Sequence, residues 1–280
     1  MTKDLYLVRG IKRALGLHMP GRMLDVFPDD TFLVTYPKCG STWVRFLVAN
    51  LTSPEKHPDF TNINVLFPDY QAYSKRALNR LPRPRTMKSH QYFDPRYRKV
   101  LYIVRDPRDV VLAEYHFGIK QRLHDENYPL ADYIPRFLVG NTGHAYGSWF
   151  EHLASWYFTR RNDPQFLLVR YESLHSQTAT ELARIADFLG VPSDPSRLAF
   201  AIEQSDAKHM RALEKKQAHV FSSTKETRLD LPYIRVAKAG GWRVNLPREH
   251  VASIESAWGS LMEEMGYELT VATPGEVATH

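Results

Sequence analysis

Three segments of the chain repeat one order of elements: a short apolar run, a turn and an amphipathic helix. The apolar runs are residues 31–36 (TFLVTY), 100–104 (VLYIV) and 166–169 (FLLV). Apolar runs without polar alternation are typical of strands that are buried on both faces. Strand–turn–helix units in series favour a parallel sheet with right-handed crossovers. We therefore predict an α/β fold of three layers, in which helices flank a central, mostly parallel β-sheet.

The rest of the chain adds one short strand and several helices. Residues 85–88 (RTMK) are a plausible fourth strand, and the clearest helices of the second half are 147–160 and 247–265. No Gly/Ser/Pro linker divides the 280 residues, so we expect a single domain. Residues 1–29 are interpreted as an N-terminal extension and residues 268–280 as a flexible tail.

Polar side chains follow each predicted strand directly. Ligands of open parallel sheets bind at the carboxyl ends of the strands. We therefore expect one edge of the sheet to carry the residues that follow the four strands, Lys38, His90, Arg105 and Tyr171.

The first turn, residues 36–43 (YPKCGSTW), has the composition of an anion site. A strand that enters a helix through a glycine turn collects free backbone N–H groups at the helix N-terminus. Lys38 adds a positive charge there, and Ser41 and Thr42 add hydroxyl groups. The lysine precedes Gly40, unlike in a Walker loop, which argues against an ordinary ATPase or GTPase. The alternative is a tight turn in which Ser41 or Thr42 caps the helix.

These motifs together resemble one family, the sulfotransferases that use 3′-phosphoadenosine 5′-phosphosulfate (PAPS). Residues 36–43 are similar to the family's 5′-phosphosulfate loop, usually Tyr-Pro-Lys-Ser/Ala-Gly-Thr/Ser-Thr-Trp. Four further segments follow in the family's order: residues 88–90 (KSH), residues 104–111 (VRDPRDVV), Tyr171-Glu172, and Arg235 with Gly240-Gly241-Trp242. The resemblance covers residues 31–265 and implies a P-loop NTPase-like sulfotransferase fold and a sulfotransferase activity with PAPS as the cofactor.

The resemblance also implies roles for individual residues. His90 matches the catalytic base, and Lys38 and Lys88 match cations beside the transferred sulfuryl group. An imidazole titrates near neutral pH, which suits a general base. Positions matched to the cofactor are Lys38, Cys39, Gly40, Ser41, Thr42, Trp43, Arg105, Ala113, Tyr171, Arg235, Lys238 and Gly240.

Three positions depart from the family pattern near the cofactor's 3′-phosphate. Ala113 stands where a serine is usual, residues 236–237 (VA) replace a Lys-Gly pair, and Gly241 replaces an aspartate before the tryptophan. The resemblance therefore implies that the 3′-phosphate is held somewhat differently, with Arg105 as its main ligand.

The acceptor pocket is expected around residues 146–152 (YGSWFEH), which resemble an acceptor-lining helix of cytosolic members. Candidate wall residues are Phe67, Tyr92, Phe93, Tyr146 and His152. The acceptor, a small molecule or saccharide with a hydroxyl or amine, stays open, as does the oligomeric state. We expect no metal, since the sequence has no HExxH motif and no histidine–carboxylate cluster at ligand spacing.

Charge and cysteine content limit the partners and the compartment. The net charge of +6 is mild, but residues 75–99 hold nine Lys or Arg against Asp94, a local excess of +8. This excess suits an anionic cofactor, and it also supports the alternative of a basic nucleotide- or RNA-binding domain without turnover. The single cysteine, Cys39, fits a reducing, cytoplasmic location.

Two further alternatives stay open in the sequence. Cys39 and Arg45 have the C-x5-R spacing of cysteine-dependent phosphatases, although Phe46 follows where Ser or Thr is usual. Leu5, Val8, Ile11 and Leu15 are spaced as a helical stripe, which favours packing on the domain over docking on a membrane surface. No apolar run has the length of a membrane span, and neither a nucleic-acid partner nor a membrane span is expected.

Overall fold

The computed structural model describes residues 24–70, 73–235 and 238–271. Within them, four strands form one sheet: β1 (Thr31–Thr35), β2 (Thr86–Ser89), β3 (Lys99–Val104) and β4 (Phe166–Arg170). The expected N-terminal stripe and most of the expected tail lie outside the described residues.

The sheet has the order β2-β1-β3-β4, and each neighbouring pair is parallel. In the register, Thr31 lies opposite Thr86 on one side and Lys99 on the other, while Val100 lies opposite Phe166. The predicted α/β class with a parallel sheet is thus confirmed. Each predicted strand is present, with ends that differ by at most one residue.

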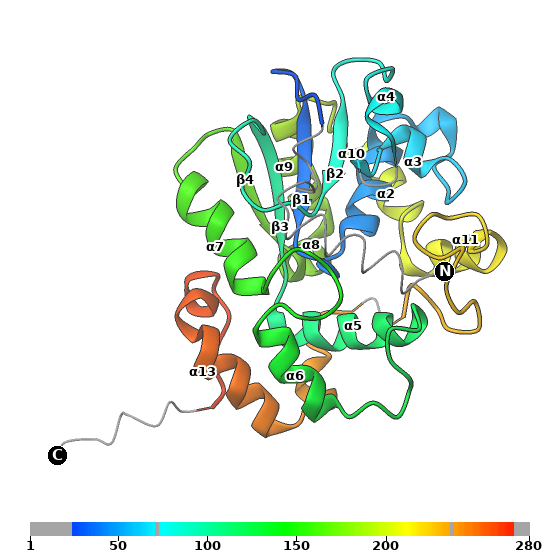
Figure 1. Ribbon diagram of the computed structural model, residues 1–280. Helices are drawn as coiled ribbons and strands as arrows, with labels where there is room; N and C mark the ends of the chain where they lie inside the picture. The colour runs from blue at the N-terminus through cyan, green and yellow to red at the C-terminus, as the bar shows by residue number, and fades with distance from the viewer. Residues whose placement is uncertain (1–23, 71–72, 236–237, 272–280) are drawn as a thin grey trace.

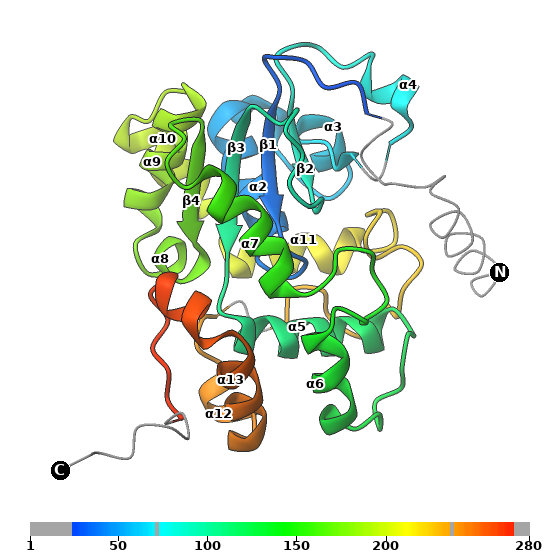
Figure 2. The same ribbon diagram turned by 60° about the vertical axis from the view of Figure 1, so that its left-hand side comes forward.

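Helices cover both faces of the sheet, as Figures 1 and 2 show. They are α2 (Ser41–Thr52), the 3₁₀ turn η1 (Pro54–Lys56), α3 (Ile63–Leu66), α4 (Lys75–Leu78), α5 (Pro107–Lys120), α6 (Leu130–Leu138), α7 (Trp149–Arg160), α8 (Tyr171–Ser176), α9 (Thr178–Leu189), α10 (Pro195–Glu203), α11 (Ala207–Gln217), α12 (Trp242–Asn245) and α13 (Arg248–Glu264). The short helix α8 occupies part of the segment expected as a turn after β4.

Two hydrophobic cores lie on opposite faces of the sheet, because alternate strand residues point to opposite sides. Phe32 and Val34 of β1 belong to the core that α6, α7 and α13 share. Leu33 of the same strand belongs to the core of α2, α9 and α10. Apolar residues on both faces explain why the strands read as unbroken apolar runs.

No helix among the described residues is long and apolar enough to cross a bilayer.

Candidate active site

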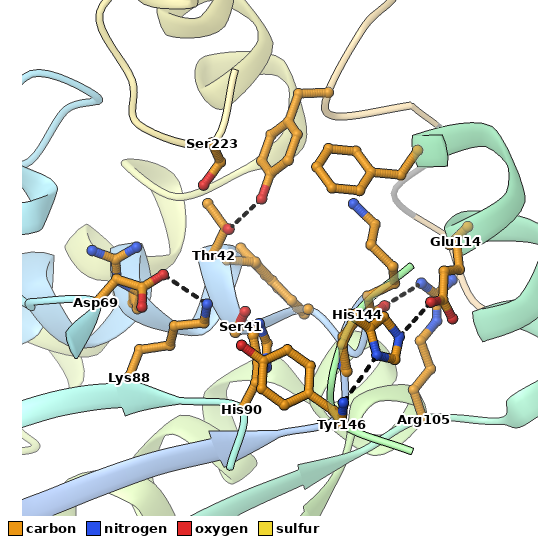
Figure 3. Close-up of a pocket in the computed structure, with 18 of the residues that line it drawn as sticks. Ser41, Thr42, Asp69, Lys88, His90, Arg105, Glu114, His144, Tyr146 and Ser223 are labelled. Atoms are coloured by element: carbon orange, nitrogen blue, oxygen red, sulfur yellow. Dashed lines mark hydrogen bonds and ion pairs between the residues drawn. The ribbon is translucent and has the colours of Figure 1, made fainter. Parts of the chain in front are cut away.

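One large cavity lies at the carboxyl ends of the strands. The four residues that directly follow the strands or their first turn, Lys38, His90, Arg105 and Tyr171, all line it. Its volume is about 2170 Å³, whereas pockets for one small ligand hold about 300–1,000 Å³. The cavity therefore has room for a nucleotide and a second molecule. Figure 3 shows the part of it between Lys88 and Arg105.

The turn between β1 and α2 requires glycine at its last position. Gly40 has φ of 91°, and a Cβ there would lie 2.7 Å from two ring carbons of Tyr171. Only glycine therefore lets this ring pack on the turn. No side chain caps α2; the Thr42 hydroxyl bonds to the Tyr233 hydroxyl instead, at 2.8 Å. The alternative of a Ser41 or Thr42 cap is wrong, and the first N–H groups of α2 have no side-chain cap.

Lys38 enters the cavity from this turn with φ of 64°. Its ammonium group lies 3.8 Å from the centre of the Phe117 ring and 4.8 Å from that of Tyr233. Burial, together with the nearby charge of Arg105, lowers the pKa of Lys38 to about 7. A phosphate beside this lysine would favour the protonated form.

Arg105 joins the phosphate turn to the late part of the chain. Its two terminal nitrogens donate to the carbonyls of Lys38, at 3.2 Å, and Lys238, at 3.1 Å. The guanidinium carbon lies 4.5 Å from the centre of the Tyr171 ring, and Asp109 is an ion-pair partner at 3.6 Å. Its Nε–H is buried and has no hydrogen-bond partner among the described residues. One donor of the fork therefore stays available to a ligand.

The late segment is fixed by an aspartate of α5. Asp109 accepts hydrogen bonds from the backbone N–H of Gly240, at 2.8 Å, and of Trp242, at 2.9 Å. Ala113 and Arg235 line the cavity, and burial lowers the pKa of Arg235. Gly240 is not part of the cavity lining, so its role here is to let the segment reach Asp109.

Three neighbouring rings form an aromatic part of the cavity lining. The Trp43 ring packs edge-on against Tyr171, with ring centres 5.7 Å apart, and against His175, at 6.2 Å. All three side chains line the cavity. Flat aromatic rings in a cavity are suited to contact a nucleobase.

His90 is held in one tautomer by the end of β1. Its Nδ1 lies 2.6 Å from the carbonyl oxygen of Thr35 and 3.2 Å from the hydroxyl of the same residue. A carbonyl only accepts, so Nδ1 carries the proton and Nε2 keeps its lone pair. Burial, with the nearby charge of Lys88, holds the pKa of His90 well below its ordinary value of 6.5. The imidazole is therefore neutral at pH 7, as a general base requires.

Lys88 is paired with a buried acid that sequence reasoning missed. The Nζ atom of Lys88 lies 2.7 Å from Oδ2 of Asp69, and the two side chains are 9% and 12% exposed. Burial opposes ionisation of Asp69, but the charges of Lys88 and Arg45 hold its pKa below the ordinary value. Breaking such a pair would leave one charge buried alone, so Asp69 fixes the position of the lysine.

The expected acceptor residues divide into two groups. Tyr92, Phe93 and Tyr146 line the cavity, and the ring of Tyr146 has its centre 5.5 Å from that of His90. Phe67 and His152 do not line it, and their predicted place on the pocket wall is wrong. The Phe67 ring is buried in the core beneath α2.

His152 lies behind the catalytic candidate rather than in front of it. Its Nδ1 is 2.8 Å from the Tyr102 hydroxyl, and its Nε2 is 3.1 Å from the carbonyl oxygen of His90. The side chain is fully buried, and burial lowers its pKa to about 3. α7 turns this residue towards the sheet, where it supports the backbone of His90.

Comparison with known proteins assigns the family. A sequence profile described as Sulfotransferase domain matches residues 28–266. The chain belongs to the sulfotransferase family. Sulfotransferase 1B1 of Canis lupus familiaris is 33% identical over 178 residues, which cover 58% of this chain and 59% of that protein. Sulfotransferase 4A1 of Mus musculus is 32% identical over 209 residues, 67% of this chain and 72% of that protein.

Solved sulfotransferase structures share the fold. Mouse sulfotransferase SULT7A1 complexed with PAP has a TM-score of 0.71 at 22% identity, covering 87% of each chain. Retinol dehydratase in complex with androsterone and inactive cofactor PAP has a TM-score of 0.72 at 20% identity, covering 90% of this chain and 84% of that one. The family and fold expected from the motifs are thus confirmed.

The phosphatase alternative does not fit this sulfotransferase. Cys39 is fully buried and is not part of the cavity lining, and burial raises the pKa of its thiol. Arg45 lines the cavity, but its guanidinium is bound by the protein: it donates to the carbonyl of Ile63, at 3.2 Å, and to Oδ1 of Asn64, at 2.7 Å. A nucleophilic thiolate beside a phosphate-clamping arginine is therefore absent from this arrangement.

Substitution of Cys39 by serine tests this point. The variant is expected to keep its sulfotransferase activity within about threefold, since Ser replaces a buried side chain of similar size that has no role in the transfer. Transfer rates and phosphate-ester hydrolysis of the two proteins should be compared. A loss of more than 90% of activity would support a role for the thiol.

The basic segment 75–99 is largely neutralised in the structure. Five of its nine cations form ion pairs with acids: Lys75–Asp25, Arg83–Asp29, Arg85–Asp30, Lys88–Asp69 and Arg96–Asp94. Only one of these acids lies inside the segment. Cations that are already paired with acids attract a polyanion only weakly. The excess of Lys and Arg counted in the sequence of residues 75–99 therefore overstates the positive potential of this segment. Among the described residues, no group of three or more His, Cys, Asp or Glu is placed to hold a metal ion.

Proposed function

We propose that the cavity binds PAPS and that this sulfotransferase moves its sulfuryl group to a hydroxyl or amine of a small-molecule or saccharide acceptor. The observation that carries the proposal is the convergence of the phosphate turn, Lys38, Lys88 and His90 on one cavity. Family membership supports the reaction class. Two structural neighbours, SULT7A1 and retinol dehydratase, are complexed with PAP, the spent cofactor.

The residues present fit a nucleotide with two phosphate sites. The turn at Gly40 leaves space that a Cβ would fill, and the N–H groups of Ser41 and Thr42 follow it at the start of α2. Arg105 has a buried, unpartnered Nε–H at the far side of the turn. In our proposal the α2 N-terminus and Lys38 hold the 5′-phosphosulfate. Arg105, with Arg235 and Lys238, holds the 3′-phosphate, which explains how the site can dispense with a serine at position 113.

The residues of the cavity have separate roles in the proposed sulfuryl transfer. The bound cofactor supplies the sulfuryl group and a phosphate as the leaving group. His90 Nε2 accepts the proton of the acceptor hydroxyl or amine, since Nδ1 is fixed on Thr35. Lys38 and Lys88 stabilise the negative charge that develops between the two oxygens. Trp43 and Tyr171 contact the adenine, and Tyr92, Phe93 and Tyr146 orient the acceptor.

Calorimetric titration with PAP tests the cofactor assignment. PAP is expected to bind at a single site, and adenosine 5′-phosphate is expected to bind about 10- to 100-fold more weakly, because it lacks the charge-assisted hydrogen bonds of the 3′-phosphate. Binding of both nucleotides with equal affinity would contradict the proposed 3′-phosphate site. No heat of binding at millimolar PAP would refute the proposed function.

A further inference from the structure

A buried glutamate of α5 lines the cavity beside the acceptor residues. The side chain of Glu114 is 6% exposed and belongs to the cavity lining. Its Oε1 accepts a hydrogen bond from the hydroxyl of Thr142, at 2.6 Å, and lies 2.5 Å from Nε2 of His144. Figure 3 shows the Glu114 carboxylate directed at His144.

The second oxygen of this carboxylate is unsatisfied. Oε2 of Glu114 is buried and has no hydrogen-bond partner within residues 24–70, 73–235 and 238–271. A buried acceptor without a partner keeps the full cost of its desolvation, which is larger when the acceptor is charged. The local structure therefore binds one oxygen twice and leaves the other for a group that the chain does not provide.

The imidazole beside Glu114 does not neutralise it. The Nδ1 atom of His144 accepts a hydrogen bond from the backbone N–H of Tyr146, at 3.3 Å. Nε2 then carries the single ring proton and donates it to the carboxylate. An imidazole with one donor and one acceptor nitrogen is neutral, so no lysine or arginine forms an ion pair with Glu114 among the described residues. The charge of Lys38 acts on this carboxylate only from beyond ion-pair distance.

Two other acids of the cavity lining have a lysine or an arginine as their partner. Asp69 pairs with Lys88, and Glu126 pairs with Arg228. Among the described residues, the one ion-pair partner of Glu114 is the imidazole of His144.

The ring of Tyr146 contacts both the proposed base and the histidine that is paired with Glu114. Its centre lies 5.5 Å from that of His90 and 5.3 Å from that of His144. A small acceptor whose reacting group meets His90 can thus extend past Tyr146 towards Glu114.

We propose that Glu114, oriented by Thr142 and His144, is a specificity residue that selects acceptors bearing an ammonium group at a distance from the hydroxyl that is sulfated. The inference rests on the proposed function, since it places the acceptor between His90 and Glu114. An ammonium group supplies both the donor that Oε2 lacks and a cation in direct contact with the carboxylate.

Matched pairs of acceptors test the inference. One pair is 4-(2-aminoethyl)phenol and 4-propylphenol, which differ in an ammonium against a methyl group; the other is the corresponding pair of benzyl alcohols. Their affinities for the PAP-saturated protein and their initial rates with PAPS should be measured. We expect the amine of at least one pair to be preferred by about 10- to 100-fold in kcat/KM and in affinity.

Glu114→Gln is the decisive variant, because it keeps the size and the acceptor towards Thr142 while it removes the charge. It is expected to lose the amine preference and to bind the neutral partner within about twofold of wild type. Glu114→Asp, which keeps the charge, retains a preference for the amine. Glu126→Gln is the matched control, because it removes a carboxylate that is 60% exposed on the same cavity. It should leave the affinity and the kcat/KM of both acceptors unchanged.

The outcomes separate the two proposals. If PAP does not bind, the proposed function fails. If PAP binds but wild type prefers neither amine, or binds no member of either pair, the inference is overturned and the cofactor assignment stands. An equal loss of both partners in Glu114→Gln, with unchanged PAP affinity and melting temperature, would mean that Glu114 only holds the loop of Thr142 and His144.

Discussion

Replacement of His90 by alanine is expected to lower kcat by about 10²- to 10⁴-fold, while the affinity for PAP stays within a few-fold of wild type. The reason is geometric: the side chain meets the cavity through Nε2, and its other nitrogen is fixed on the Thr35 carbonyl. Truncation leaves the β2 backbone in place, because His152 bonds to the carbonyl of His90 and not to its ring. Single-turnover rates and calorimetry with PAP measure the two quantities.

The pH profile gives an independent check of the same residue. Because burial and Lys88 hold the pKa of His90 well below 6.5, the imidazole is an unprotonated base throughout the neutral range. On the acid side, kcat/KM is therefore expected to hold until the pH drops through that low pKa, where the base becomes protonated. His57→Ala, at an exposed histidine outside the cavity lining, is the control. An alanine variant of His90 that keeps wild-type turnover would rule out the base assignment.

Replacement of Lys38 by methionine is expected to lower kcat by about 10²- to 10³-fold, since it removes a preorganised charge from the leaving phosphate. The Lys38→Met variant should also differ from wild type in the number of protons taken up when PAP binds. In the free protein, burial lowers the pKa of Lys38 to about 7, and an anionic ligand raises it. Wild-type protein is therefore expected to take up about half a proton on binding PAP at pH 7.

The sign of this effect sets the pH dependence of PAP affinity. Below pH 7 the ammonium is already present, so affinity is highest there. As the pH rises above 7, binding must protonate the lysine and affinity falls. Calorimetry at pH 7 in buffers of different ionisation enthalpy measures the uptake. Lys38→Met should abolish it, whereas Lys216→Met, at an exposed lysine of α11, should not; uptake that persists without Lys38 assigns the proton to another group.

The strands and the edge that carries the site are predictable because their signal is local. A strand buried on both faces must be apolar along its length, so the sequence alone predicts strands at residues 31–36 and 100–104. Parallel pairing then aligns all carboxyl ends, which brings Lys38, His90 and Arg105 to one cavity. The glycine of the phosphate turn is equally local, since φ of 91° at Gly40 excludes other residues.

The errors of the sequence interpretation concern the direction of side chains. His152 and Phe67 lie close to the site in the chain or in space, yet α7 and the end of α3 direct them into the interior. Helical spacing alone does not say which face a cavity occupies. The sequence also contained no signal for Asp69 as the partner of Lys88, because nineteen positions separate them and no periodic pattern links them.

The chain's motifs by themselves determined the family, the parallel sheet and the edge where the cavity opens, since each depends on a few neighbouring residues or on the period of a strand. The tertiary structure alone decided how charge is distributed. It paired four cations of the basic segment, Arg85 among them, with acids from outside that segment. It also placed Glu114 beside a neutral imidazole with one oxygen unsatisfied. Such pairings join residues that are far apart in the sequence, and burial, which only the folded chain defines, sets their energies.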